Sequence, residues 1–191
     1  MCIRDRAYDM YDMLGSVVQS VQAHCVFPTP EEFELMSRRK KLWVAHCPQS
    51  NMNANGVAAP IRRYLDAGIH VGLGTDIAGS NTLSMFRTIS DTIVASKIYW
   101  NSMERKGDPF AEKTYLTVSE AFYLATKGGC SFWGKAGSFE EGSLFDAVVI
   151  DDAPLWDFNN RSLRQRIERV VFQGDERHTV AKFINGRKVY G

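Results

Sequence analysis

The fold of this chain is decided by the stretch Leu42-Trp43-Val44-Ala45-His46-Cys47-Pro48-Gln49-Ser50-Asn51. It begins with a short apolar run that is typical of a buried strand, and the run ends at His46. A loop of small and polar residues follows, and Pro60 to Leu65 then predicts a short helix that stops near Gly68. The stretch therefore predicts a strand that is followed by a helix.

The same order of elements is predicted on both sides of this stretch. Ser20 to Phe27 has the character of a short buried strand, and Thr29-Pro30-Glu31-Glu32 combines an N-cap, an N1 proline and a capping-box glutamate that open a helix. Ile69 to Leu73 predicts a third strand, which leads through the loop Gly74 to Asn81 into a long amphipathic helix. The apolar positions assigned to that helix are Leu83, Phe86, Ile89, Ile93 and Trp100. Consecutive strand-helix units indicate an α/β fold with a parallel sheet.

The C-terminal third has a different character. A capping box at Thr117 to Glu120 predicts a helix that ends at the glycine pair Gly128-Gly129. Phe145 to Ile150 is strand-like, and the last residues, from Val180 to Tyr190, predict a hairpin whose turn is Asn185-Gly186. We therefore expect a small β-rich appendage after the α/β units.

Three segments are expected along the chain. Residues 1–6 fit no structural period and are interpreted as a non-native leader. Residues 7–139 are expected to form a partial (β/α) barrel, and residues 140–191 the β-rich C-terminal region.

Composition excludes several classes of protein. Of the 191 residues, 45% are hydrophobic, and 23 Lys and Arg balance 22 Asp and Glu, so no nucleic-acid partner is expected. No apolar run is long enough to span a bilayer, so no membrane partner is expected either. The four cysteines are scattered without C-x-x-C spacing, which favours reduced thiols and a cytoplasmic location.

Polar residues at the ends of the predicted strands are the candidates for chemistry. His24, His46 and Asp76 each follow an apolar run, and catalytic groups of (β/α)8 barrels project from the C-terminal ends of strands. An aspartate there can bind a divalent metal, and a nearby histidine can polarise a substrate. Without a family context, Asp76 is more often a turn or cap residue and His24 equally often a core histidine. His46 is expected to be structural, and no role is expected for His70 or His178.

A metal or nucleophilic site that uses cysteine is not expected. The H-x-E and P-C-x-x-C pattern of zinc-dependent nucleobase deaminases is absent. Cys25 and Cys47 each follow a histidine, but neighbouring side chains of a strand point to opposite faces. A joint Cys/His metal site is therefore not predicted, and a Cys/His nucleophilic pair would need an oxyanion hole and an orienting group that the sequence does not show.

The strand-end motifs resemble those of deaminases in the amidohydrolase superfamily. Val21 to Cys25, Val44 to Asn51 and Val71 to Asp76 occur in the order found in that superfamily. Further stretches are similar to the guanine deaminase family: Ser84 to Arg87, Glu120 to Thr126 and Gly137 to Gly142. The resemblance covers nearly everything after Tyr8.

The resemblance implies the C-terminal strands and helices of a (β/α)8 metal-dependent hydrolase barrel. It implies that His24 contacts the substrate and assists the addition of water, and that Asp76 binds zinc and exchanges protons with that water. The implied reaction is the hydrolytic deamination of guanine, a small purine, to xanthine and ammonia. Zn²⁺ is the metal implied, although Fe²⁺ or Mn²⁺ would also suit these donors. The complete enzyme is expected to be a homodimer.

The resemblance also leaves parts of the family pattern without a counterpart. These are the H-x-H metal pair, a further histidine with its glutamate, and the arginine that recognises the purine. The chain is therefore expected to be a C-terminal fragment that is inactive and binds zinc poorly alone. The alternatives are another deaminase or a chlorohydrolase of the superfamily, and a non-catalytic truncated fragment or assembly module.

Overall fold

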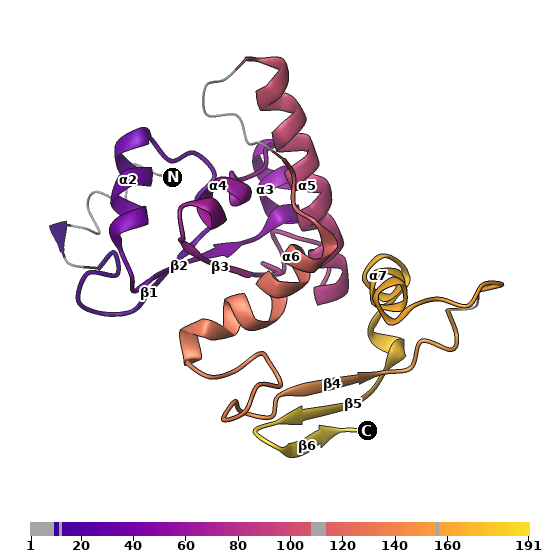
Figure 1. The fold of residues 1–191 in the computed structure, drawn as a ribbon. Helices are drawn as coiled ribbons and strands as arrows, with labels where there is room; N and C mark the ends of the chain where they lie inside the picture. The colour runs from indigo at the N-terminus through magenta and orange to yellow at the C-terminus, as the bar shows by residue number, and fades with distance from the viewer. Residues whose placement is uncertain (1–9, 12, 108–113, 156) are drawn as a thin grey trace.

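The chain folds around two small sheets that lie at different ends of the molecule (Figure 1). The computed structural model describes residues 10–11, 13–107, 114–155 and 157–191. The leader expected at residues 1–6 lies outside these ranges. Within them, no helix has both the length and the apolar character needed to cross a membrane.

The first sheet is parallel, as the repeated strand-helix units predict. Its strands are β1 (Ser20–Ala23), β2 (Leu42–His46) and β3 (His70–Leu73), with β2 in the centre. Ser20 pairs with Leu42 at one end of β1, and His46 pairs with Leu73 at the end of β2. The carboxyl ends of all the strands therefore lie along one edge of the sheet.

Helices pack around this sheet in two groups. α2 (Pro30–Arg38) and α4 (Ile61–Asp66) contribute buried residues to the same core as the strands. α5 (Met85–Arg105) and α6 (Val118–Tyr123) contribute to a second buried cluster. Both predicted capping boxes are confirmed, at the N-termini of α2 and α6. The assignment of Leu83 to the long helix is wrong, because α5 begins at Met85 with Ser84 as its N-cap. The largest fully buried side chains include Tyr64, Leu42, Ile61, Leu116 and Leu124.

The loop expected after His46 is a helix instead. α3 (Pro48–Asn55) has Pro48 in its first turn and ends at Gly56, whose φ of 63° is left-handed. A proline in the first turn and a glycine at the end are common helix boundaries. Ser50 and Asn51 are buried in α3, so its inner face is polar and lacks the apolar period that identifies a helix in sequence.

The glycine pair Gly128-Gly129 does not end its helix, contrary to expectation. A π-helical turn, Leu124–Gly128, follows α6, and Gly129 keeps helical dihedral angles. The pair instead allows close packing on β3: a Cβ added to Gly72 would lie 2.8 Å from the Cα of Gly129. Both positions must be small for this helix to approach the sheet.

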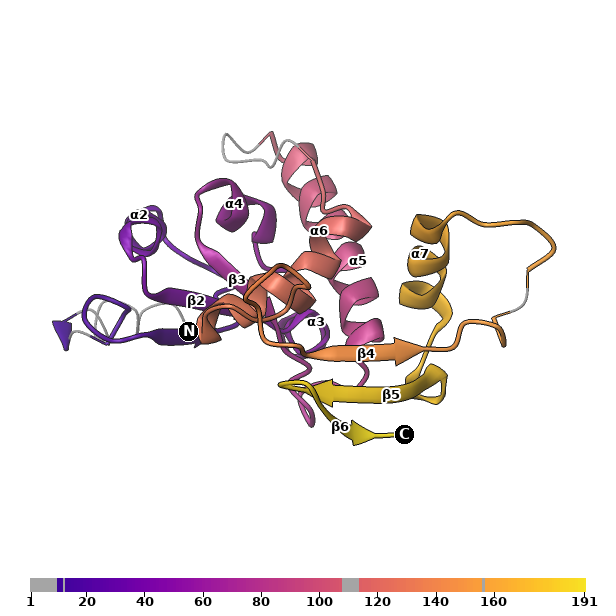
Figure 2. The ribbon, with the colours of Figure 1, turned by 60° about the horizontal axis from the view of Figure 1, so that its bottom comes forward.

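The second sheet is antiparallel and contains the predicted hairpin (Figure 2). Its strands are β4 (Ala147–Ile150), β5 (Thr179–Ile184) and β6 (Arg187–Tyr190). Asn185 and Gly186 have φ of 48° and 76°, which confirms the predicted Asn-Gly turn. The predicted boundary between the partial barrel, residues 7–139, and the C-terminal region, residues 140–191, stays a prediction.

One helix of this region was not predicted. α7 (Leu163–Gln173) lies beside α5 (Figure 2) and places Val171 in a buried cluster with Ile89, Ile93 and Ala121. This contact joins the C-terminal region to the helices around the parallel sheet.

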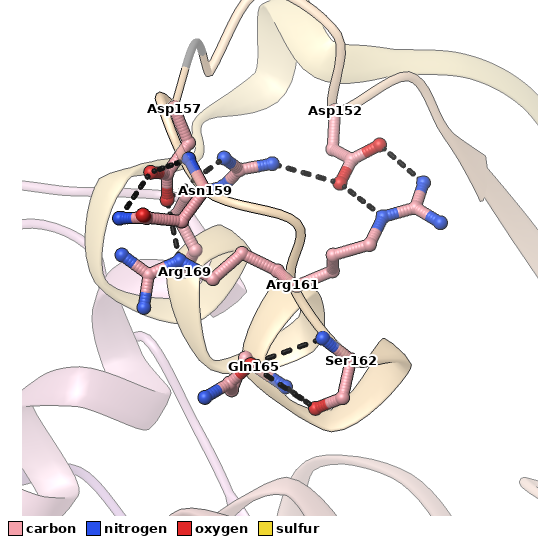
Figure 3. Close-up of polar contacts among 8 residues, drawn as sticks. Asp152, Asp157, Asn159, Arg161, Ser162, Gln165 and Arg169 are labelled. Carbon is pink, nitrogen blue, oxygen red and sulfur yellow. Dashed lines mark hydrogen bonds and ion pairs between the residues drawn. The ribbon is translucent and has the colours of Figure 1, made fainter.

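Ion pairs attach the segment between β4 and α7 to that helix (Figure 3). Asp152 accepts hydrogen bonds from Arg166 at 2.6 Å and from Arg169 at 3.1 Å. Asp157 pairs with Arg161 at 2.5 Å and lies 3.6 Å from Arg169. Arg169 thus connects both carboxylates to the helix.

The close packing of the helix on β3 predicts the effect of a single methyl group. Gly72→Ala should lower the free energy of unfolding by about 1–3 kcal/mol, because backbone atoms must shift to admit the new Cβ. Denaturant unfolding measures the change. Gly129→Ala is the graded comparison, since its Cβ would meet its nearest atom at 3.2 Å and should cost less. Wild-type stability of the Gly72→Ala chain would contradict the packing.

The ion pairs of Asp152 predict a pH-dependent stability. Arg166, and then Arg169, hold the pKa of Asp152 well below its usual range. A pKa lowered by folding gives stability that is present above the unfolded-state value of about 4 and is lost as the pH falls below it. Asp152→Asn should therefore lower Tm by a few degrees at neutral pH, and the difference should shrink in acid.

Thermal unfolding at a series of pH values tests this expectation. Glu141→Gln, which neutralises an exposed carboxylate of the same region, is the matched control. A difference between Asp152→Asn and wild type that is the same at neutral and acidic pH would show that the ion pairs do not contribute in this way.

Candidate active site

The predicted site residues meet at the carboxyl edge of the parallel sheet. The amide of His24 donates to the carbonyl of Ala45, and the amide of Gly74 donates to the carbonyl of His46, both at 2.9 Å. These bonds continue the backbone hydrogen bonding between the strands beyond the ends of β1 and β3. The backbone is therefore fixed where the chain leaves β1 and β3, at the carboxyl ends of the strands.

His24 and Asp76 face each other across this edge. The Nε2 atom of His24 lies 3.8 Å from Oδ2 of Asp76, and the two side chains are 24% and 38% exposed. The structure thus brings together the histidine and the aspartate that the sequence singled out. Their partial exposure leaves both groups accessible to a ligand.

Asn51 of α3 orients the imidazole of His24. Its Oδ1 atom lies 2.8 Å from Nδ1 of His24, and Asn51 is only 2% exposed. An amide oxygen only accepts hydrogen bonds, so Nδ1 carries the proton and Nε2 is the nitrogen turned toward Asp76. No local pattern in the sequence indicates this contact, because Asn51 and His24 are 27 positions apart.

The loop that carries Asp76 is held in a strained conformation. Asp76 has a φ of 48°, and its carbonyl accepts hydrogen bonds from the amides of Gly79 and Ser80. A Cβ at Gly79 would lie 2.8 Å from Oδ2 of Asp76, so only glycine leaves the carboxylate in this position. Gln49 and Asn53 of α3 hydrogen-bond the same loop, at the amide of Asn81 and the carbonyl of Gly79.

His46 is a buried neutral side chain. It is 1% exposed, and its ring nitrogens have no hydrogen-bond partner among the described residues. Burial, and then the proximity of His24, lower the pKa of His46 to about 3. The structural role expected for His46 stays a prediction.

Cys47 joins the site, contrary to the expectation that no cysteine would. One ligand atom each from His24, Cys47 and Asp76 lies within 4.8 Å of the others. The alternation of side chains does not apply here because β2 ends at His46 and Cys47 is the N-cap of α3. Burial, and then the charge of Asp76, raise the pKa of the Cys47 thiol to about 11. An imidazole, a thiol and a carboxylate are donor types that suit zinc.

The remaining histidines lie elsewhere. His70 stacks on Trp43 with ring centroids 4.6 Å apart, and His178 accepts a hydrogen bond from the amide of Asp175. These contacts do not involve His24 or Asp76.

A parallel α/β sheet with a histidine and an aspartate at the carboxyl ends of its strands is the arrangement from which barrel enzymes build their active sites. The chain belongs to the amidohydrolase family, whose profile matches residues 6–189.

Known relatives include guanine deaminases. The guanine deaminase of Dictyostelium discoideum is 31% identical over 189 residues, which are 95% of this chain and 40% of that protein. The crystal structure of a guanine deaminase from C. acetobutylicum with guanine in its active site has a TM-score of 0.87 and 38% identity. It covers 97% of this chain, which spans 42% of that one.

Part of a chlorohydrolase has a similar fold. The zinc complex of the atrazine chlorohydrolase TrzN from Arthrobacter aurescens matches with a TM-score of 0.68 and 25% identity, over 90% of this chain and 36% of its own. The described fold therefore resembles part of several amidohydrolases.

The contact between Asn51 and His24 predicts a defined tautomer. In the wild-type chain, neutral His24 should carry its proton on Nδ1, and Asn51→Ala should shift the population toward the Nε2-protonated form. Long-range ¹⁵N–¹H NMR correlations of the imidazole ring measure the tautomer directly. Asn53→Ala changes the same residue type in the same helix without touching His24 and should leave the tautomer unchanged. An Nε2-protonated ring in the wild type would refute the assignment.

Proposed function

We propose that this chain supplies part of the active site of a zinc-dependent guanine deaminase, which converts guanine and water to xanthine and ammonia. The observation that carries the proposal is the pairing of His24 and Asp76, 3.8 Å apart, in a chain 38% identical to a guanine deaminase that was crystallised with guanine. The chain spans only 40% of the Dictyostelium relative. That the other active-site residues come from the part of the enzyme that this chain does not cover is therefore also proposed. The parallel strands would form part of an eight-stranded barrel.

Asp76 would bind the metal through its carboxylate and exchange protons with the attacking water. Its side chain is 38% exposed, and the loop hydrogen bonds to Gly79 and Ser80 hold it at the strand edge. When bound, zinc supplies Lewis acidity at this position. The carboxylate is close enough to His24 for both groups to act on one small substrate.

His24 would contact the purine through Nε2. Because Asn51 holds Nδ1, the free nitrogen has a fixed direction, which lowers the cost of orienting it when the substrate binds. The neutral, fully buried His46 has no part in this step.

A chimera tests the proposal. Residues 7–191 of this chain should replace the matching segment of the C. acetobutylicum guanine deaminase and support guanine deamination with zinc. Asp76→Asn should reduce kcat/KM by on the order of 10³-fold or more, because a metal site contributes several kcal/mol to transition-state stabilisation. Asp66→Asn, an aspartate at the end of α4, is the matched control and should retain activity.

The TrzN match makes a chlorohydrolase the second candidate. The chimera should therefore also be assayed with a chlorotriazine and with adenosine. A folded, zinc-loaded chimera that acts on one of these substrates and not on guanine would overturn the proposed substrate.

A further inference from the structure

Three donor groups of different chemistry meet at the carboxyl edge of the sheet. One ligand atom each from His24, Cys47 and Asp76 lies within 4.8 Å of the other two. Metal–ligand bonds of about 2.0–2.3 Å place two ligands of one tetrahedral ion within roughly 4 Å of each other. Small rotations of these side chains would therefore bring all the donors into coordination range.

The surrounding backbone makes room for the thiol. Cys47 is 5% exposed, and a Cβ at Gly74 would lie 3.0 Å from its Sγ atom. Gly74 thus leaves the space in which the sulfur lies. The amide of Gly74 also bonds the carbonyl of His46, which fixes this glycine beside the residue that precedes Cys47.

Asn51 prepares the imidazole for coordination. Metal-binding histidines usually donate their second ring nitrogen to an oxygen acceptor, which fixes the tautomer and the direction of the ligating nitrogen. Asn51 Oδ1 fulfils this role at Nδ1 of His24, at 2.8 Å, and leaves Nε2 turned toward Asp76.

We propose that His24 Nε2, Cys47 Sγ and the carboxylate of Asp76 bind one thiophilic divalent cation within this chain. The thiol proton is released to solvent as the sulfur binds the ion, and water completes the coordination. A thiolate and an imidazole favour Zn²⁺, Co²⁺ or Cd²⁺ over Mg²⁺ or Ca²⁺. The site needs no residue outside the described ranges and does not rest on guanine as the substrate.

This site has a consequence for the proposed enzyme. His24 would serve either the purine or the cation, because Nε2 is its single free ring nitrogen. A cation held by the three groups would therefore exclude the substrate from this imidazole.

Cobalt titration of the 191-residue chain tests the site. The chain should carry Cys2→Ser, to remove the thiol that lies outside the described residues, and should be kept reduced and free of oxygen. Co²⁺ should produce a sulfur-to-cobalt charge-transfer band in the near ultraviolet with saturable, one-to-one stoichiometry. Added Cys47→Ser should abolish the band, whereas Cys25→Ser, the matched change at the other His-Cys pair, should retain it.

Further variants keep the test decisive if circular dichroism shows that Cys47→Ser is not folded. Asn51→Ala keeps every donor and should weaken Co²⁺ binding by about 10–100-fold, as expected for an outer-shell partner. Gly74→Ala should weaken it by crowding the sulfur. A cobalt spectrum without a thiolate band, or a band that is lost in Cys25→Ser and kept in Cys47→Ser, would overturn the proposal. None of these readouts depends on deamination, so the two proposals fail separately.

Discussion

The hydrogen-bond ladder of the parallel sheet is the constraint on which the candidate site depends. The ladder continues beyond the strands, through the bonds from His24 to Ala45 and from Gly74 to His46. These bonds determine where the chain leaves β1 and β3, so the side chains that follow begin at defined points on one edge. Residues far apart in sequence then reach the same space because the strands are parallel and adjacent in the order β1-β2-β3.

Backbone strain is concentrated at this edge and is offset by α3. Left-handed conformations of non-glycine residues cost of order 1–3 kcal/mol each, and they persist only where the surroundings enforce them. The residues concerned near the site are His24, Cys25, Asp76 and Ala78. Asn51 holds the ring of His24, while Gln49 and Asn53 hold the loop that carries Asp76. One short helix therefore positions both sides of the site, which explains why its inner face is polar.

The sequence predicts those elements in which burial or backbone conformation restricts the choice of residue at neighbouring positions. The apolar run at Leu42–His46 and the turn at Asn185-Gly186 are recognisable because burial and positive φ each restrict residue choice at those positions. α3 is missed because Ser50 and Asn51, which it buries, are polar, so no apolar period marks the helix. Gly128-Gly129 resembles a helix terminus in the sequence. Glycine is required there because Gly72 of β3 packs against the pair. Such a contact between distant segments leaves no pattern in the sequence near either of them.

The same limit applies within the site. His24 and Asp76 are predictable because strand ends converge, whereas the position of Cys47 depends on where β2 stops. The carbonyl of His46 accepts the bond from the amide of Gly74, the imidazole of His46 is buried with its pKa near 3, and Cys47 lies beside Asp76 where α3 begins. The donors beside the carboxylate therefore come from three segments that meet only in the folded chain, and the sequence around Cys47 alone does not show this meeting.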